Sequence, residues 1–307
     1  MDTKLFVRQQ PGGMFSILDR ESFPTGKVWW VGSTVTGATN SVGYGRNPDA
    51  PLASIVYAIT QAAAGDTVFV LPGHAENVAS ADAMNFSKAG MSVIGLGNAN
   101  TRPTITLTTA TAARIAVSAA NVTLKNLIIK CTIDECVTGI SVTAAGCTLD
   151  AVDFQEASAA AQLRQFLLTT ADANDLTIQN CRHYALTTAG AAQVWLGLVG
   201  TNRLVIRDNI FHITANNNAN SHAIQIATTA ATQINIDNNL ITLLGGTTIA
   251  SAINIVNASS GQVSRNMVAL TTTTLAGSLV LGDGVYGNQN YVVKAADNSG
   301  ILDPSPE

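Results

Sequence analysis

Apolar and polar positions alternate along most of this 307-residue chain in a unit that returns at a nearly constant interval. Each copy alternates with period two, breaks at one position that is usually Asn or Asp, and then resumes with apolar residues. The copies step by 25, 29, 28, 30 and 27 residues at their central apolar position, which is Leu124, Leu149, Ile178, Ile206, Ile236 and Val263. Period-two alternation predicts half-buried strands, and a repeat in the twenties predicts a solenoid.

A second, shorter apolar strand follows each copy, and no stretch between the two has the spacing of a helix. These shorter strands are predicted at residues 138–142, 165–168, 194–198, 223–226, 252–256 and 278–281. One repeat therefore forms one coil of strands, and the coils stack on one another. The chain is predicted to be an all-β, right-handed, single-stranded parallel β-helix of about eight coils.

The break in each repeat predicts a tight corner. The aligned corner residues are Asn126, Ala151, Asn180, Asp208, Asn238 and Arg265. Asn and Asp tolerate the left-handed backbone conformation that such a corner needs. The next position carries Asn209, Asn239 and Asn266 in three consecutive coils, where stacked side-chain amides can hydrogen-bond to one another. We interpret these asparagines as structural rather than ligand-binding.

Four segments are predicted along the chain. Residues 1–27, which Gly and Pro interrupt, form a docking arm, and residues 28–66 hold a strand, a loop and a capping helix. Residues 67–292 form the β-helix, and residues 293–307 form a C-terminal tail.

The capping helix is predicted to begin at Pro51 and to end at Gly65, with Leu52, Ile55, Val56 and Ile59 on one buried face. Such a helix would cover the open apolar end of the first coil.

Composition narrows the possible partners. Charged residues make up 12% of the chain, about half of the usual share, and the net charge of −4 comes without a basic block. Nucleic acid is therefore not expected as a partner. No apolar run is long enough to span a membrane, and the first residues lack the pattern of a secretory signal.

Of the four cysteines, Cys147 and Cys181 fall at apolar positions of the repeat, so we expect small buried side chains. Cys131 and Cys136 lie close in sequence but lack a metal-site pattern. Free thiols fit a protein assembled in a reducing cytoplasm.

Three motifs occur in order along the chain: Leu52-Ala-Ser-Ile-Val-Tyr-Ala-Ile59, Gly65-Asp-Thr-Val-Phe-Val-Leu-Pro-Gly73 and Asn121-Val-Thr-Leu-Lys-Asn126. Over about residues 48–292, this order resembles the right-handed parallel β-helix superfamily that includes pectate lyases. Within it, the chain resembles virion proteins of tailed bacteriophages more closely. The resemblance implies the fold and leaves function open, because the fold hosts lyases, hydrolases, epimerases and inert spikes.

Sugar-cleaving β-helices work with acidic side chains on the outer face, either as a base or as a carboxylate pair. The best candidate cluster is Asp150 and Asp153 on one coil with Arg182 and His183 on the next. Asp153 and Arg182 occupy one repeat position on adjacent coils, so opposite charges would stack there. We interpret the cluster as surface ion pairing and expect no catalytic residue.

Two further pairs of opposite charge, Lys125 with Asp150 and Arg207 with Asp237, are predicted by the same stacking rule.

The remaining histidines suggest little chemistry. His212 and His222 flank an Asn-rich stretch, residues 215–221, which is predicted to be a turn and could bind carbohydrate. His74 lies two residues from Glu76, which alone is weak evidence for a metal. We expect neither a cofactor nor a metal site.

We predict a non-catalytic virion structural protein of a bacteriophage, most simply a capsid decoration or cement protein that stabilises the capsid. The arm would dock on the major capsid protein or another virion protein, and the shafts would associate as a homotrimer. The short shaft and the lack of a separate receptor-binding domain favour this reading. One alternative is a tail spike or fibre that binds host surface polysaccharide, and another is a polysaccharide lyase or glycoside hydrolase.

Overall fold

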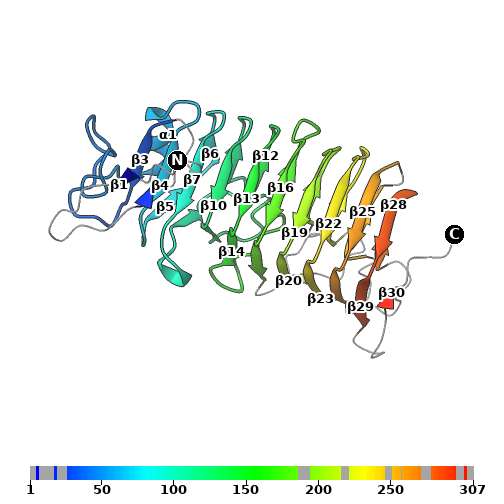
Figure 1. Ribbon diagram of the computed structural model, residues 1–307. Helices are drawn as coiled ribbons and strands as arrows, with labels where there is room; N and C mark the ends of the chain where they lie inside the picture. The colour runs from blue at the N-terminus through cyan, green and yellow to red at the C-terminus, as the bar shows by residue number, and fades with distance from the viewer. Residues whose placement is uncertain are drawn as a thin grey trace.

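The computed structural model describes residues 26–185, 194–215, 221–245, 251–256, 258–270 and 278–294, together with three short strands at residues 5–6, 17–18 and 301–302. Three long parallel sheets run the length of the molecule (Figure 1). Each coil gives one strand to each sheet in turn, so the eight strands of the third sheet complete eight coils. The predicted parallel β-helix of about eight coils is confirmed.

Sheet 1 contains β3 (Val28–Val31), β4 (Thr67–Val70), β7 (Ser92–Gly95), β10 (Thr123–Lys125), β13 (Thr148–Asp150), β16 (Thr177–Gln179), β19 (Val205–Arg207), β22 (Ile234–Asp237), β25 (Ser260–Ser264) and β28 (Gly284–Asn288).

Sheet 2 contains β5 (Ala75–Val78), β8 (Thr104–Leu107), β11 (Ile128–Cys131), β14 (Asp153–Glu156), β17 (Arg182–Tyr184), β20 (Ile210–Ala215), β23 (Leu240–Gly245), β26 (Met267–Leu270) and β29 (Asn290–Lys294), with β30 (Ile301–Leu302) pairing antiparallel to β29.

Sheet 3 contains β6 (Ala81–Phe86), β9 (Arg114–Val117), β12 (Ile140–Val142), β15 (Leu167–Thr169), β18 (Val194–Leu198), β21 (His222–Ile226), β24 (Ile253–Ile255) and β27 (Leu279–Val280). A single 3-10 turn, η1, spans Ala99–Thr101.

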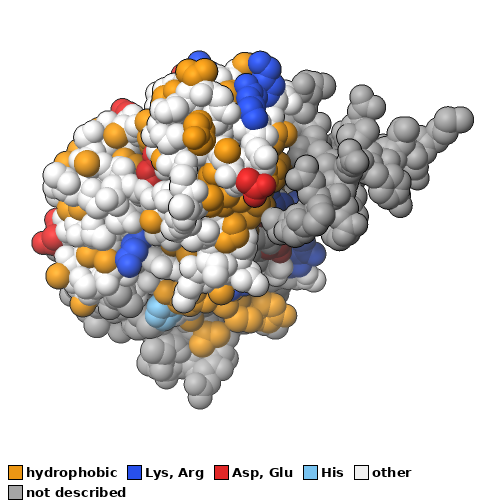
Figure 2. All heavy atoms as spheres, turned by 90° about the vertical axis from the view of Figure 1, so that its left-hand side faces the viewer, with side chains coloured by type: hydrophobic (Ala, Val, Ile, Leu, Met, Phe, Trp, Pro, Cys, Tyr) orange, Lys and Arg blue, Asp and Glu red, His pale blue; other side chains and the backbone are white. Residues whose placement is uncertain are grey.

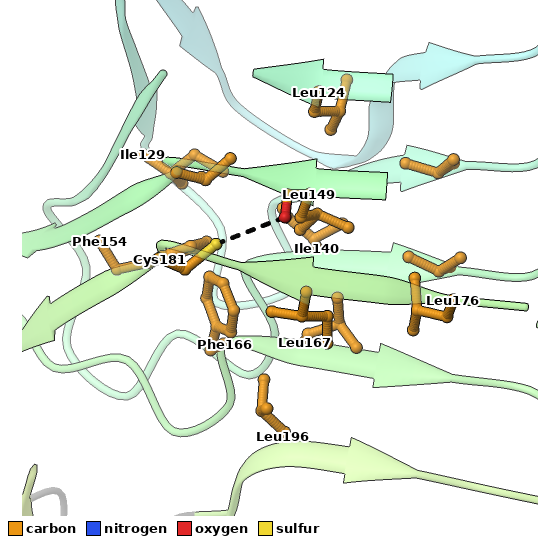
Figure 3. Close-up of a cluster of buried hydrophobic side chains, with 14 of the residues drawn as sticks. Leu124, Ile129, Ile140, Leu149, Phe154, Phe166, Leu167, Leu176, Cys181 and Leu196 are labelled. Carbon is orange, nitrogen blue, oxygen red and sulfur yellow. Dashed lines mark hydrogen bonds between the residues drawn. The ribbon is translucent and has the colours of Figure 1, made fainter. Parts of the chain in front are cut away.

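The interior is filled by ladders of apolar side chains that the period-two pattern directs inward. All six central positions of the repeat, from Leu124 to Val263, are at most 1% exposed. In Figure 3, the side chains of Ile140, Leu167 and Leu196 follow one another up one ladder of sheet 3. Burying each such side chain contributes about 1.5–3 kcal/mol, so the interior is the main source of stability.

The corner between sheets 1 and 2 has the predicted left-handed backbone in all six repeats. The φ angles of the six aligned residues lie between 52° and 58°, including those of Ala151 and Arg265. The N–H of each corner residue donates to the carbonyl that ends the sheet 1 strand of the next coil, as Asn126 does to Asp150 at 2.9 Å. The conformation therefore directs the corner N–H along the stack, which offsets the steric cost for residues other than Gly, Asn and Asp.

The predicted asparagine ladder is present and is one rung longer than expected. Asn209, Asn239, Asn266 and Asn290 are all buried, and each Oδ1 after the first accepts from both the backbone N–H and the Nδ2 of the preceding asparagine, at 2.8–3.1 Å. The ladder begins where the N–H of Cys181 donates to Asn209 Oδ1 at 2.9 Å. Its role is structural, as interpreted from the sequence.

The capping helix is present, but its predicted start at Pro51 is wrong. Helix α1 spans Ile55–Gln61, and the Ser54 hydroxyl accepts from the N–H of Tyr57 as an N-cap. Leu52 is buried but extended, because its N–H and C=O bond to the backbone of Trp30 and Gly32. Val56, predicted to lie on the buried face, is 36% exposed.

Helix α1 contacts β3, β4 and β6 at the N-terminal end of the coil stack. Figure 2 shows this end of the molecule, where charged side chains are few and scattered among apolar and uncharged ones. No helix in the described ranges is long and apolar enough to cross a membrane.

The two terminal segments are only partly described. Within the predicted arm, β1 (Leu5–Phe6) pairs antiparallel with β2 (Ile17–Leu18), and most of residues 1–27 lies outside the described residues. The same holds for the predicted tail beyond residue 294, apart from β30.

Candidate functional site

The outward side chains of sheet 2 form two columns that cross the strands. One column runs through Thr104, Ile128, Asp153, Arg182 and Ile210, and the other through Thr106, Lys130, Gln155, Tyr184 and His212. Successive rungs are separated by the strand spacing of about 4.8 Å. The middle rungs of these columns carry the polar and aromatic side chains of the face.

An open groove with a volume of about 270 Å³ lies on these middle rungs. It is lined by Asp153, Gln155, Arg182 and Tyr184, and by the inward-pointing Phe154 and Glu156. The ring of Tyr184 is 53% exposed, and its centroid lies 6.2 Å from that of His212 on the next rung. The groove therefore combines a guanidinium, an amide, two carboxylates and an accessible aromatic ring.

The carboxylate of Asp153 is held by a cation from an earlier coil. Arg102 forms an ion pair with Asp153 and also donates to the carbonyls of Ala99 and Ala151, at 3.2 and 3.3 Å. The side chains of Arg102 and Asp153 are only 12% and 19% exposed. Asp153 is thus both neutralised and fixed in place.

The predicted pairing of Asp153 with Arg182 is wrong in its partner. The two residues are in register on adjacent strands, as expected, but the carboxylate pairs with Arg102 instead. Arg182 is exposed and has no ion pair among the described residues. The sequence rule missed Arg102 because a long side chain at the end of a turn can reach past its neighbouring coil.

Of the other two predicted charge pairs, one is present and the other is not. Lys125 Nζ lies 2.8 Å from Asp150 Oδ2, as predicted. Burial opposes ionisation of Asp150, but hydrogen bonds from Lys125 and Asn180 outweigh it and lower the pKa of this carboxyl. Asp237 pairs with Arg265 and not with Arg207, which donates to Gln179 Oε1 instead, at 2.8 and 3.0 Å.

The four residues of the sequence-derived cluster do not meet. Asp150 lies at the end of β13 in sheet 1, and the corner at Ala151 separates it from Asp153 in sheet 2. His183 points into the interior, where its ring centroid is 3.7 Å from that of Trp195 and its Nε2 is 3.9 Å from Glu156. Only Asp153 and Arg182 share the groove.

Burial holds the pKa of His183 well below its usual range, so the ring is neutral. Neither ring nitrogen has a hydrogen-bond partner within the part of the chain that is described. The side chain therefore packs as a core residue and faces away from the groove.

Gln155 and Tyr184 are the groove residues that sequence reasoning missed. Each stands two positions after a candidate residue, Gln155 after Asp153 and Tyr184 after Arg182. Because side chains two apart on a strand share a face, the period-two pattern contained the signal that would have found them.

The remaining histidines have structural surroundings. His74 Nδ1 accepts from the N–H of Ser33 at 3.0 Å, so its Nε2 carries the proton and donates to Glu76 at 3.1 Å. Glu76 in turn accepts from the N–H groups of Ile55 and Val56 at the start of α1. His222 is buried, which lowers its pKa, and its Nδ1 donates to the carbonyl of Ser251.

The Asn-rich stretch between His212 and His222 lies, for residues 216–220, outside the described residues. No group of three or more potential metal-binding side chains occurs among the residues that the structure describes.

Comparison with solved structures identifies proteins of the same architecture at low identity. The chain is similar to pectate lyase Pel9A, with 12% identity, a TM-score of 0.44 and coverage of 92% of this chain and 80% of the lyase. It is similar to a rhamnogalacturonan lyase, with 14% identity, a TM-score of 0.48 and coverage of 87% and 74%. No family model and no curated protein matches the chain.

The three stacked parallel sheets make the chain a parallel β-helix, which is the fold that the resemblance implied. A bacteriophage CBA120 tailspike protein also matches, with 12% identity, a TM-score of 0.16 and coverage of 89% and 62%. Such a score carries no argument for a phage origin.

The prediction that this chain is not an enzyme is contradicted by the two lyases. At 12–14% identity the likeness concerns the fold and transfers neither a substrate nor a residue.

Proposed function

We propose that this chain binds an acidic polysaccharide along the outer face of sheet 2. The observation that carries the proposal is the groove in which Arg182, Gln155 and Tyr184 lie on adjacent strands beside a carboxylate that Arg102 already neutralises. This set of groups matches the parts of a sugar acid: a carboxylate, hydroxyl groups and an apolar ring face.

The charge balance of the face favours an anionic ligand. Between β8 and β20, the charged side chains on the outward columns are Lys130, Asp153 and Arg182, and Arg102 adds a third cation. With Glu156 of the groove lining included, three positive charges face two negative ones, so the face is locally positive on a chain whose net charge is −4. A cleft of one sign concentrates ligands of the opposite sign, and a guanidinium can bind a carboxylate through two parallel hydrogen bonds.

The spacing of the rungs favours a polymer. Strands stack at about 4.8 Å, so the outward side chains of the face repeat at a short and regular interval. A polymer lying across the strands would therefore meet several rungs in succession. Gln155 can donate to and accept from hydroxyl groups, while the exposed ring of Tyr184 offers an apolar face for stacking.

The test is affinity electrophoresis and calorimetry with polygalacturonate and with neutral dextran as probes. Arg182→Ala is expected to weaken binding of polygalacturonate about tenfold or more, since it removes an interaction worth about 1.5–3 kcal/mol. Tyr184→Ala is expected to weaken it about two- to twelvefold, since it removes a stacking interaction worth about 0.5–1.5 kcal/mol beyond its burial. The matched controls are Arg207→Ala and Tyr286→Ala, which remove exposed side chains of the same types from sheet 1. Equal binding of both polymers, or equal loss in the controls, would refute the proposal.

The same mixtures should be followed for cleavage, through new reducing ends and the ultraviolet absorbance of unsaturated products. Because this fold includes lyases, turnover that Arg182→Ala abolishes would extend the proposal from recognition to catalysis.

A surface that recognises polysaccharide is what the tail-spike or fibre alternative requires, and we propose that role in preference to capsid decoration. The virion location, the capsid partner and the homotrimer stay predictions. Copy number per particle separates the two virion roles, since a decoration protein covers the shell in many more copies than a spike. Light scattering of the purified protein tests the trimer.

A further inference from the structure

The four cysteines fall into two kinds of surroundings. All four are buried and reduced. Cys147 Sγ lies against the backbone carbonyls of Ala119 and Ala144, and Cys181 Sγ lies 3.8 Å from the carbonyl of Leu149 (Figure 3). These two thiols are packed as small apolar side chains, as the repeat predicts.

Cys131 and Cys136 instead lie against each other. Cys131 ends β11, and its Sγ is 3.7 Å from the carbonyl oxygen of Gln162, the same oxygen to which the N–H of Cys136 donates at 2.9 Å. The two thiols also interact, and each shifts the pKa of the other. A disulfide requires the sulfur atoms to approach to about 2.05 Å, and the shared Gln162 carbonyl brings the Cys131 side chain to the backbone of Cys136.

We propose that Cys131 and Cys136 are a dithiol that closes to an intramolecular disulfide when the protein meets a low-molecular-weight disulfide oxidant such as oxidised glutathione. The Cys131 thiolate attacks one sulfur of the oxidant, and one reduced thiol leaves. The Cys136 thiolate then attacks the Cys131 sulfur of the mixed disulfide, and a second reduced thiol leaves. The protein loses two electrons and two protons, which the two released thiols carry.

The order of the two attacks follows from the interaction between the two thiols. This interaction lowers the pKa of Cys131 and raises the pKa of Cys136. The thiolate is the nucleophile in thiol–disulfide exchange, so Cys131 reacts first.

Access to the pair depends on one short segment. Residues 132–135 connect the two cysteines, and Thr132 and Asp134 within it are exposed. Local opening of such a surface segment costs far less free energy than global unfolding, so the oxidant can reach the thiols while the coils stay folded. A cytoplasm would keep the pair reduced, and an oxidising exterior would close it.

The disulfide would fasten the segment beside the groove. Cys131 is the register partner of Glu156 at the end of β14, and Cys136 forms an isolated bridge with Leu163 on the same later coil. The disulfide would therefore fix the turn at residues 132–135, which lies next to the end of the groove strand β14. This inference does not depend on what the groove binds.

The test is incubation of the folded, reduced protein with oxidised glutathione, followed by intact mass and by alkylation of the remaining thiols. We expect a mass loss of about 2 Da, a fall from four alkylated cysteines to two, and a peptide map that joins Cys131 to Cys136. Cys147→Ala and Cys181→Ala should show the same loss, whereas Cys131→Ala and Cys136→Ala should show none. Circular dichroism checks that each variant is folded.

Two results would overturn the inference. One is retention of all four thiols, in buffer and in urea too dilute to unfold the coils, while a reference dithiol peptide oxidises fully. The other is a disulfide that includes Cys147 or Cys181.

Discussion

Removing one rung of the asparagine ladder should destabilise the coil stack more than removing an exposed asparagine from the same corner. Asn239 is 1% exposed, and its side chain takes part in five hydrogen bonds. Its Oδ1 accepts from the N–H and Nδ2 of Asn209, and its Nδ2 donates to two backbone carbonyls and to Asn266. The perturbation is Asn239→Ala.

The expected magnitude follows from the groups that the substitution leaves without partners. In Asn239→Ala, the backbone N–H of Asn209 and one Nδ2 proton of Asn209 lose their acceptor inside the stack. Each buried donor left unsatisfied costs about 1–3 kcal/mol, so the variant should lose about 2–6 kcal/mol of the free energy of unfolding.

The matched control is Asn238→Ala, one residue earlier. Asn238 is exposed, and its Nδ2 donates to Asp208 at 2.7 Å at the surface. Its φ angle is 52°, but Ala151 occupies the equivalent corner at 54°, so alanine can adopt this conformation. The control should lose about 1.5–3.5 kcal/mol, which combines about 0.5–1.5 kcal/mol for a surface hydrogen bond and about 1–2 kcal/mol for the left-handed backbone.

Urea unfolding followed by circular dichroism measures both variants, and hydrogen exchange locates the effect. Because stacked repeats can unfold in parts, exchange should rise first in β19–β23, around the missing rung. A loss in Asn239→Ala no larger than that in Asn238→Ala would refute the claim that the ladder is a stabilising element.

Three further predictions concern the cap, an ion pair and the interior. Ser54→Ala removes the N-cap of α1 and should cost about 1 kcal/mol, seen as faster exchange of the α1 amides, with Ser118→Ala as a surface control. The pKa of Asp150 is lowered in the folded protein, so the stability that its carboxylate contributes is present above the unfolded value of about 3.9 and is lost as pH falls below it. Asp150→Asn should therefore flatten the acid limb of a curve of stability against pH. An unchanged acid limb would contradict this. Leu149→Ala, in the filled interior, should cost about 2–5 kcal/mol in urea unfolding, and a loss below 1 kcal/mol would show a loosely packed core.

The coil could be predicted from the sequence because each inward position and each corner is fixed by the coil above and below it. The corner shows this clearly, since Ala151 and Arg265 are poor choices for a left-handed backbone and still adopt it. Their position in the repeat was a better guide than their residue type, because the stack requires the corner N–H to point to the next coil. Asn290 was missed because the last coil lacks the apolar pattern that marks the others.

The start of the cap could not be predicted from its apolar spacing. Leu52 has the spacing of a helix position but is drawn into pairing with β3, and the helix begins only after Ser54. The carboxylate of Glu76, from a different coil, accepts from the first N–H groups of α1. Both influences come from residues distant in sequence, which a local pattern does not contain.

The groove was predictable in position but not in chemistry, and the reason is the freedom of its outward side chains. A register rule fixes which Cα atoms are neighbours, so Asp153 and Arg182 were correctly placed on adjacent rungs. It does not fix where a long side chain goes, and Arg102 takes the carboxylate that Arg182 was expected to hold. That exchange changes the function that the cluster implies, because a satisfied surface pair would be inert. A guanidinium without an ion pair among the described residues, beside an exposed ring, is what the proposed binding of a sugar acid requires.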